Sequence, residues 1–84
     1  MKQIERTQTG LRLEKRLVKV MKALAEHFDI SVADLVEGTM LHVLEGKAPP
    51  FGETTLRKIA QMKEIYDLDL DASDAHKLHE GSPN

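Results

Sequence analysis

The chain has 84 residues, a net charge of −2 and no cysteine. Such a length allows one domain with a limited core, so that a second subunit is the expected source of additional stability. The absence of cysteine excludes disulfides and thiolate metal sites. No apolar run approaches the roughly 18 residues of a membrane span, and residues 1–6 lack the apolar core of a secretory signal. These features predict a cytoplasmic protein with no membrane partner.

The charge is distributed unevenly along the chain. Residues 1–22 carry seven basic and two acidic side chains, whereas residues 23–46 carry five acidic side chains and no lysine or arginine. Residues 47–84 have a net charge of −2. A dimer would double the positive charge of the N-terminal part. An asymmetry of this kind predicts a polyanionic partner for that part of the chain.

The first predicted elements are a flexible arm over residues 1–6 and a strand over residues 8–13. Apolar and polar side chains alternate in this stretch, which is the period of a half-buried strand. One side carries Thr9, Leu11 and Leu13, and the other side carries Gln8, Gly10 and Arg12. Gly10 weakens the strand prediction, because glycine has no side chain to pack in a sheet.

Two helices are predicted next. Residues 14–28 place apolar side chains at helical spacing along one stripe, which consists of Leu17, Val20, Met21, Leu24 and Phe28. Lys19 and Lys22 fall off this stripe and are interpreted as a solvated helix face. Ser31 is the predicted N-cap of a second helix with Asp34 three residues later, an approximate capping box. The second apolar stripe consists of Val32, Leu35, Val36, Met40, Val43 and Leu44, and Gly46 ends the helix.

The C-terminal part begins with a stiff linker over residues 48–52. A third helix is predicted from a cap at Thr54 or Thr55 to about Tyr66. Residues 67–71 alternate aspartate and leucine and are expected to pack as an extended piece, and a short helix is expected over residues 72–79. Disorder is expected over residues 81–84.

A single strand followed by helices implies a partner strand. The backbone groups of a lone strand are unpaired along both edges, and no other strand is predicted in the first 48 residues. Two identical strands that pair antiparallel about a two-fold axis would form a closed contact. We therefore expect a homodimer in which Thr9, Leu11 and Leu13 face the helices.

Residues 6–46 resemble the Arc/MetJ-type ribbon-helix-helix family of DNA-binding proteins. The resemblance rests on the strand pattern of residues 8–13, a helix ending near Ala25, and the sequence Ile30-Ser31-Val32 at the start of the next helix. It implies a mostly α fold in which an intermolecular two-stranded antiparallel β-ribbon enters the major groove of DNA. We expect residues 1–48 to form this dimerisation and DNA-binding core and residues 49–84 to form a C-terminal helical extension.

The resemblance also implies which residues contact DNA. The outward strand positions, Gln8, Gly10 and Arg12, would contact bases. Gln and Arg side chains suit adenine and guanine, whereas Gly10 departs from the pattern. The start of the second helix, at Ser31 and Val32, would bind a phosphate. The flanking side chains of Arg6, Lys15 and Arg16 are further candidates for phosphate contacts. The alternative interpretation is that Gln8 and Arg12 are ordinary solvated residues.

Other chemistry finds little support in the sequence. His76 and His79 stand three residues apart, a spacing that can bind a metal, but histidines near a chain end are more often surface residues. No nucleophile with a paired base, phosphate loop or carboxylate dyad is recognisable. We therefore predict no enzyme activity, no metal site and no cofactor.

The leading prediction is a transcriptional regulator, a repressor, that binds double-stranded DNA as a homodimer. The alternative is a dimeric protein-interaction module, including an antitoxin that binds a protein partner through residues 49–84. Three uses of that acidic extension are open: packing on its own core, binding another protein, or joining dimers on DNA.

Overall fold

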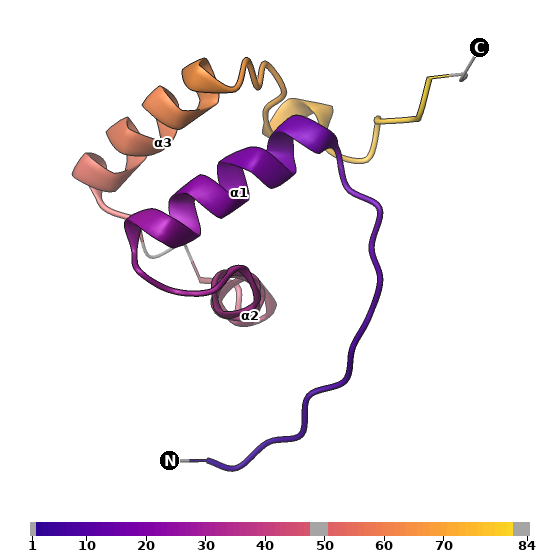
Figure 1. Ribbon diagram of the computed structural model, residues 1–84, viewed down its shortest axis with the longest axis vertical. Helices are drawn as coiled ribbons and strands as arrows, with labels where there is room; N and C mark the ends of the chain where they lie inside the picture. The colour runs from indigo at the N-terminus through magenta and orange to yellow at the C-terminus, as the bar shows by residue number, and fades with distance from the viewer. Residues whose placement is uncertain (1, 48–50, 82–84) are drawn as a thin grey trace.

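The computed structural model of the protein describes residues 2–47 and 51–81. Within these residues the chain forms three helices and one short 3-10 helix (Figure 1). The elements are α1 (Lys15–His27), α2 (Val32–Leu44), α3 (Glu53–Ile65) and η1 (Ala72–Asp74). The mostly α content is therefore confirmed.

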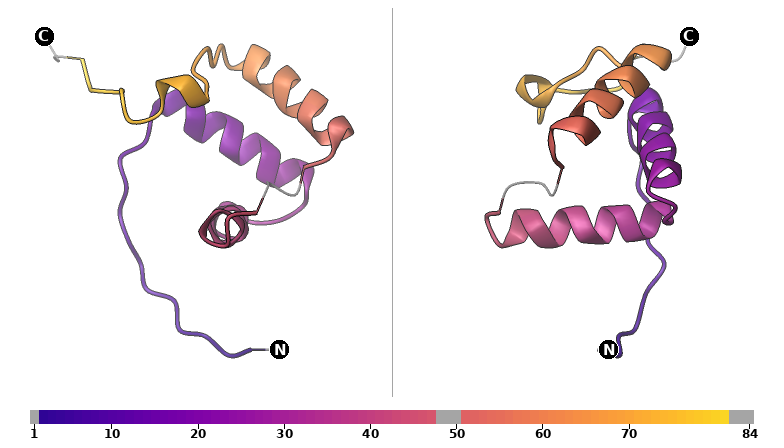
Figure 2. Two further views of the ribbon diagram at one scale, coloured as in Figure 1. Left: turned by 180° about the vertical axis from the view of Figure 1, so that it is seen from behind. Right: turned by 90° about the vertical axis from the view of Figure 1, so that its left-hand side faces the viewer.

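Helix α1 is the centre of the arrangement. It packs against both α2 and α3, while the described parts of α2 and α3 make no such contact with each other. Figure 2 shows α3 lying along α1, and α2 crossing near the C-terminal end of α1. The side chains that α1 buries are Val20, Leu24 and Ala25. Leu17 and Phe28, at the two ends of the predicted stripe, are more than one-third exposed.

Helix α2 begins as predicted but buries less than predicted. The Ser31 hydroxyl oxygen accepts a hydrogen bond of 3.0 Å from the amide of Asp34, which satisfies one of the unpaired donors of the first turn. No residue of α2 is buried, although eight of its thirteen residues are apolar. The large apolar side chains left exposed on α2 are Met40, Leu41, Val43 and Leu44.

The C-terminal part packs on α1. Helix α3 begins at Glu53 and its N-cap is Gly52, two residues before Thr54, with no side chain capping the helix, so the prediction of a threonine cap was wrong. Leu68, in the aspartate-leucine stretch, is buried like Val20, Leu24 and Ala25 of α1. The predicted helix over residues 72–79 shortens to the single turn η1.

All three helices end in the same capping motif. Asp29, Gly46 and Asp67 adopt positive φ angles of 58°, 71° and 55°. In each case the following amide donates to a carbonyl five residues earlier, with the bonds Ile30 to Ala25, Lys47 to His42 and Leu68 to Lys63. These are Schellman motifs, in which a left-handed residue lets the chain turn away while the last carbonyls stay paired.

The predicted β-ribbon is not formed. No strand occurs within residues 2–47 and 51–81, and residues 8–13 are an extended segment that leaves the start of α1 and runs away from the helices (Figure 1). The ribbon-helix-helix fold prediction was therefore wrong in its defining element. Leu11 and Leu13, expected to face the helices, are 72% and 46% exposed. The alternating pattern describes an extended backbone, but a strand also needs a neighbouring backbone to pair with, and no backbone hydrogen bond within the described residues reaches residues 8–13.

Residues 48–50 of the predicted linker, with the predicted domain boundary, and residues 82–84 of the predicted disordered end lie outside the described residues. Within the described part, no helix combines the length and apolar character that a bilayer crossing needs.

Candidate nucleic-acid interface

The first feature of the candidate interface is a row of three lysines on α1. Lys15, Lys19 and Lys22 are exposed and follow a spacing of four and three residues, which aligns side chains on one helix face. The helical period sets this face opposite Leu24, on the solvent side of α1. None of the three forms an ion pair with another described residue. We call these three residues the lysine row.

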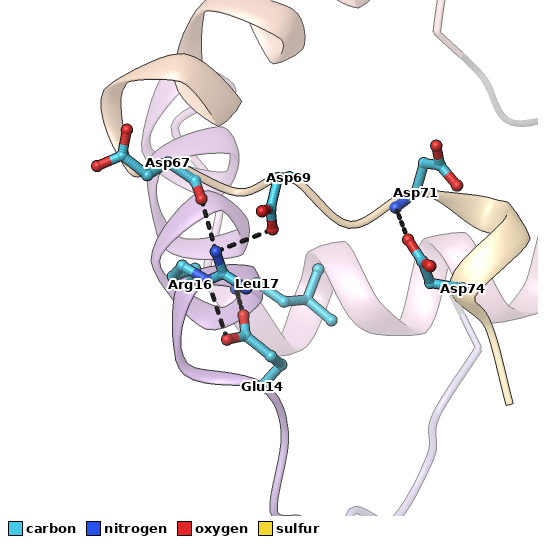
Figure 3. Close-up of polar contacts among 7 residues, drawn as sticks. All are labelled: Glu14, Arg16, Leu17, Asp67, Asp69, Asp71 and Asp74. Carbon is cyan, nitrogen blue, oxygen red and sulfur yellow. Dashed lines mark hydrogen bonds and ion pairs between the residues drawn. The ribbon is translucent and has the colours of Figure 1, made fainter. Parts of the chain in front are cut away.

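Arg16 points elsewhere and joins α1 to the C-terminal part (Figure 3). One guanidinium nitrogen, Nη1, donates to the backbone oxygen of Asp67 at 2.8 Å and to Asp69 Oδ1 at 2.9 Å. Its Nε donates to Glu14 Oε2 at 3.1 Å. Arg16 is thus already committed to three acceptors within the chain.

Glu14 connects this cluster to the start of α1. Its Oε1 accepts a hydrogen bond of 2.9 Å from the amide of Leu17, which makes it the N-cap (Figure 3). This bond lowers the pKa of the Glu14 carboxyl, and the bond from Arg16 lowers it further. A carboxylate at a helix N-terminus also interacts favourably with the helix dipole.

Arg6 ties the extended segment to α2. Its Nε and Nη2 donate to the two carboxylate oxygens of Glu37 at 2.9 and 3.0 Å. This bidentate contact lowers the pKa of Glu37 and raises that of Arg6. A shallow pocket of about 350 Å³ adjoins the pair and is lined by Ile4, Met40, Leu41 and Leu44.

Arg12 is held by the C-terminal segment. Its Nε and Nη2 donate to Glu80 Oε1 at 3.0 Å and to Glu80 Oε2 at 2.7 Å. Both side chains stay largely exposed, at 84% for Arg12 and 72% for Glu80. The other two predicted base-contacting residues, Gln8 and Gly10, are exposed in the same segment, and a Cβ added at Gly10 would meet no atom within 4 Å.

The predicted phosphate site at the start of α2 lies apart from Lys15 and Arg16. Ser31 caps the helix, Val32 is half-buried, and Asp34 adds a negative charge to the first turn. Ser31 follows the C-terminal end of α1, whereas Lys15 and Arg16 lie at its N-terminal end. The structure therefore joins Arg6, Arg12 and Arg16 to carboxylates, leaves Lys15 exposed, and does not bring Ser31 and Val32 beside Lys15 and Arg16.

The acidic partners of the three arginines were not predicted from the sequence. Glu37, Asp69 and Glu80 lie 31, 53 and 68 residues from Arg6, Arg16 and Arg12. No local pattern marks such pairs. The charge asymmetry was the available signal, since a basic N-terminal part and an acidic remainder attract each other.

The remaining titratable groups do not assemble into a metal site. Among the described residues, no three histidine, cysteine or acidic side chains stand close enough together to hold an ion. His76 and His79 are exposed, and His76 has a positive φ of 68°. Comparison of the chain with protein-family models, curated proteins and solved structures gives no match.

Proposed function

We propose that the protein binds double-stranded DNA through the lysine row and its N-terminal segment. The observation that carries this proposal is the lysine row itself: three exposed lysines on one helix face with no carboxylate partner among the described residues. Lysines in such a position bind backbone phosphates, and each contact releases counterions from DNA. Lys19 and Lys22, interpreted from the sequence as a solvated face, thereby join Lys15 as phosphate contacts.

The N-terminal segment supplies the contacts that distinguish sequences. Gln8 and Arg12 carry the amide and the guanidinium that recognise adenine and guanine, and Gly10 between them allows the backbone to approach DNA closely. Arg6 and Arg16 serve as phosphate contacts when their carboxylate partners release them, and the amides at Ser31 and Val32 offer one more phosphate site. Bound at a promoter, such a protein acts as a transcriptional repressor.

We further propose that the DNA-binding form is a homodimer joined through α2. The chain exposes 7650 Å², whereas a compact monomer of its mass exposes about 5,000 Å². The excess is well above the roughly 800 Å² that each partner buries in a standard interface. Helix α2 is apolar but has no buried residue, so its apolar side chains are expected to pack against another apolar surface. The α2 helix of a second protomer offers such a surface, and the contact between the two helices would be isologous.

The dimer is tested by sedimentation equilibrium of Leu41→Lys and of a control, Leu56→Lys. Both leucines are exposed, at 62% and 53%, but Leu56 lies on α3. We expect the wild type and Leu56→Lys to be dimeric and Leu41→Lys to be monomeric. A monomeric wild type, or loss of the dimer only in Leu56→Lys, would refute α2 as the interface.

DNA binding is tested by fluorescence anisotropy with a labelled random-sequence duplex at low salt. We expect Lys19→Gln to weaken binding several-fold, because each protomer of the dimer loses one phosphate contact. Lys58→Gln, an exposed lysine on α3, removes the same charge outside the lysine row and is expected to change affinity less. Equal effects of the two substitutions would mean that net charge alone governs binding.

A second candidate function is protein binding through residues 49–84, as in an antitoxin. Exposed apolar side chains on α3 favour it, since Leu56 and Ile65 are 53% and 71% exposed. A partner that co-purifies with the wild type and is lost in Ile65→Lys would support this function. Retention of that partner by Ile65→Lys would argue against this face of α3.

A further inference from the structure

We propose that the C-terminal segment, residues 75–81, is an internal competitor that masks Arg12 until DNA displaces it. The inference rests on the proposed DNA-binding function. Its starting point is the bidentate contact between Arg12 and Glu80, which joins residues 68 positions apart. The same two guanidinium nitrogens would bind a phosphate or a guanine edge. Arg12 therefore cannot use this pair of donors for Glu80 and for DNA at the same time.

The masking segment meets the N-terminal segment close to the start of α1. A groove of about 900 Å³ is lined by residues from both, 11–18 and 78–81. Its lining includes Leu78, Leu11, Leu13 and Leu17, so the groove has apolar side chains as well as the ion pair. Figure 1 shows the C-terminal segment beside the start of α1, where the N-terminal segment departs.

The three arginine contacts differ in how readily they can open. Glu37 belongs to a helix, and Asp69 follows the buried Leu68. Glu80 has no such anchor, because every residue from 75 to 81 is exposed. An exposed ion pair contributes little and is screened by salt. The Arg12–Glu80 contact is thus the one that the high charge density of DNA would displace most easily.

The consequence is a penalty on DNA binding that is most visible at weak sites. Phosphates of any duplex compete with Glu80 for Arg12, but a guanine edge in reach of the guanidinium adds a bidentate contact that random DNA does not always offer. A competitor that must be displaced weakens all binding by a similar factor and so lowers occupancy at weak sites most visibly. Residues 75–81 would in this way suppress non-specific binding.

The test compares Glu80→Gln with Glu64→Gln in duplex binding at about 50 mM salt. Both substitutions remove one negative charge, and no described side-chain hydrogen bond or ion pair involves Glu64. We expect Glu80→Gln to bind roughly two- to fivefold more tightly than Glu64→Gln, the range that an exposed pair can supply. In an Arg12→Gln background the difference between the two should vanish.

The outcomes separate the inference from the function on which it rests. Equal affinities of Glu80→Gln and Glu64→Gln would overturn the masking and leave DNA binding intact. A gain that persists in the Arg12→Gln background would also overturn it, because the gain would not come from Arg12. Absence of binding by every variant would overturn both. The Arg12 side-chain signal in a ¹H–¹⁵N spectrum provides a check without DNA: it should shift in Glu80→Gln and not in Glu64→Gln.

Discussion

Arg6 and Glu37 form a bidentate ion pair across 31 residues, with nitrogen–oxygen distances of 2.9 and 3.0 Å. The pair holds the N-terminal segment against α2. Its hydrogen bonds lower the pKa of Glu37 below the ordinary value of 4.5. The pKa of Glu37 is lower in the folded chain than in the unfolded chain. The ion pair therefore stabilises the N-terminal segment against α2 fully at pH values above 4.5, and this stabilisation is lost as the pH falls through the lowered pKa of Glu37.

The expected result is release of the N-terminal segment in acid. The Arg6 Nε–Hε signal should keep its position from neutral pH to below 4.5 and then move toward that of a solvated arginine. In Glu37→Gln the Arg6 Nε–Hε signal should be close to that of a solvated arginine at every pH. An Arg6 signal in the wild type that matches Glu37→Gln at neutral pH would show that the pair does not form in solution.

The cap of α2 gives a second prediction. Ser31→Ala removes the acceptor of the Asp34 amide and should lower the free energy of unfolding by about 1 kcal/mol. Ser31→Asn keeps a hydrogen-bond acceptor, so its free energy of unfolding should be close to that of the wild type. Urea unfolding followed by circular dichroism measures both. If alanine and asparagine are equally destabilising, the hydroxyl is not the cap.

Leu68 tests whether the C-terminal part belongs to the core. Its side chain is 8% exposed, whereas Leu78 is 54% exposed. Leu68→Ala should cost roughly 2 to 4 kcal/mol through lost burial and the cavity left behind, and Leu78→Ala should stay within about 0.5 kcal/mol of the wild type. Thermal unfolding of the two variants gives the comparison. A Leu68→Ala variant as stable as Leu78→Ala would mean that residues 67–71 do not pack on α1.

Asp29 occupies a left-handed position that glycine adopts without strain. At φ 58° an aspartate is tolerated but strained. Asp29→Gly should therefore raise the free energy of unfolding by roughly 0.5 to 1 kcal/mol. Asp34→Gly, inside the first turn of α2, should lower it. Destabilisation by Asp29→Gly in urea unfolding would contradict the capping geometry.

The helices could be predicted from the sequence because their signals are local. The stripe around Leu24 fixed the buried face of α1, and Ser31 marked the start of α2 within one residue. The N-cap at Gly52 was not predicted because glycine has no side chain that could mark it as a cap. Thr54 and Thr55 have side chains that commonly cap helices, and they were predicted instead.

The strand prediction failed for a different physical reason. Alternation over residues 8–13 is compatible with any extended segment, and only a neighbouring backbone turns such a segment into a strand. The ion pairs of Arg6, Arg12 and Arg16 escaped prediction because their partners are set by the tertiary fold. The lysine row follows from helical spacing, but the sequence analysis interpreted Lys19 and Lys22 as a solvated helix face and named only Lys15 of the three as a candidate DNA contact.

The most direct test of DNA binding is the affinity of the wild type for a random-sequence duplex between about 50 and 200 mM salt. With six phosphate contacts from the two lysine rows of the proposed dimer, the logarithm of the binding constant should fall linearly with the logarithm of salt concentration, with a slope near −5, about −0.9 for each contact. Lys19→Gln removes one contact from each protomer and should reduce the steepness by about two. No detectable binding at the lowest salt, or binding that salt does not weaken, would contradict the proposed function.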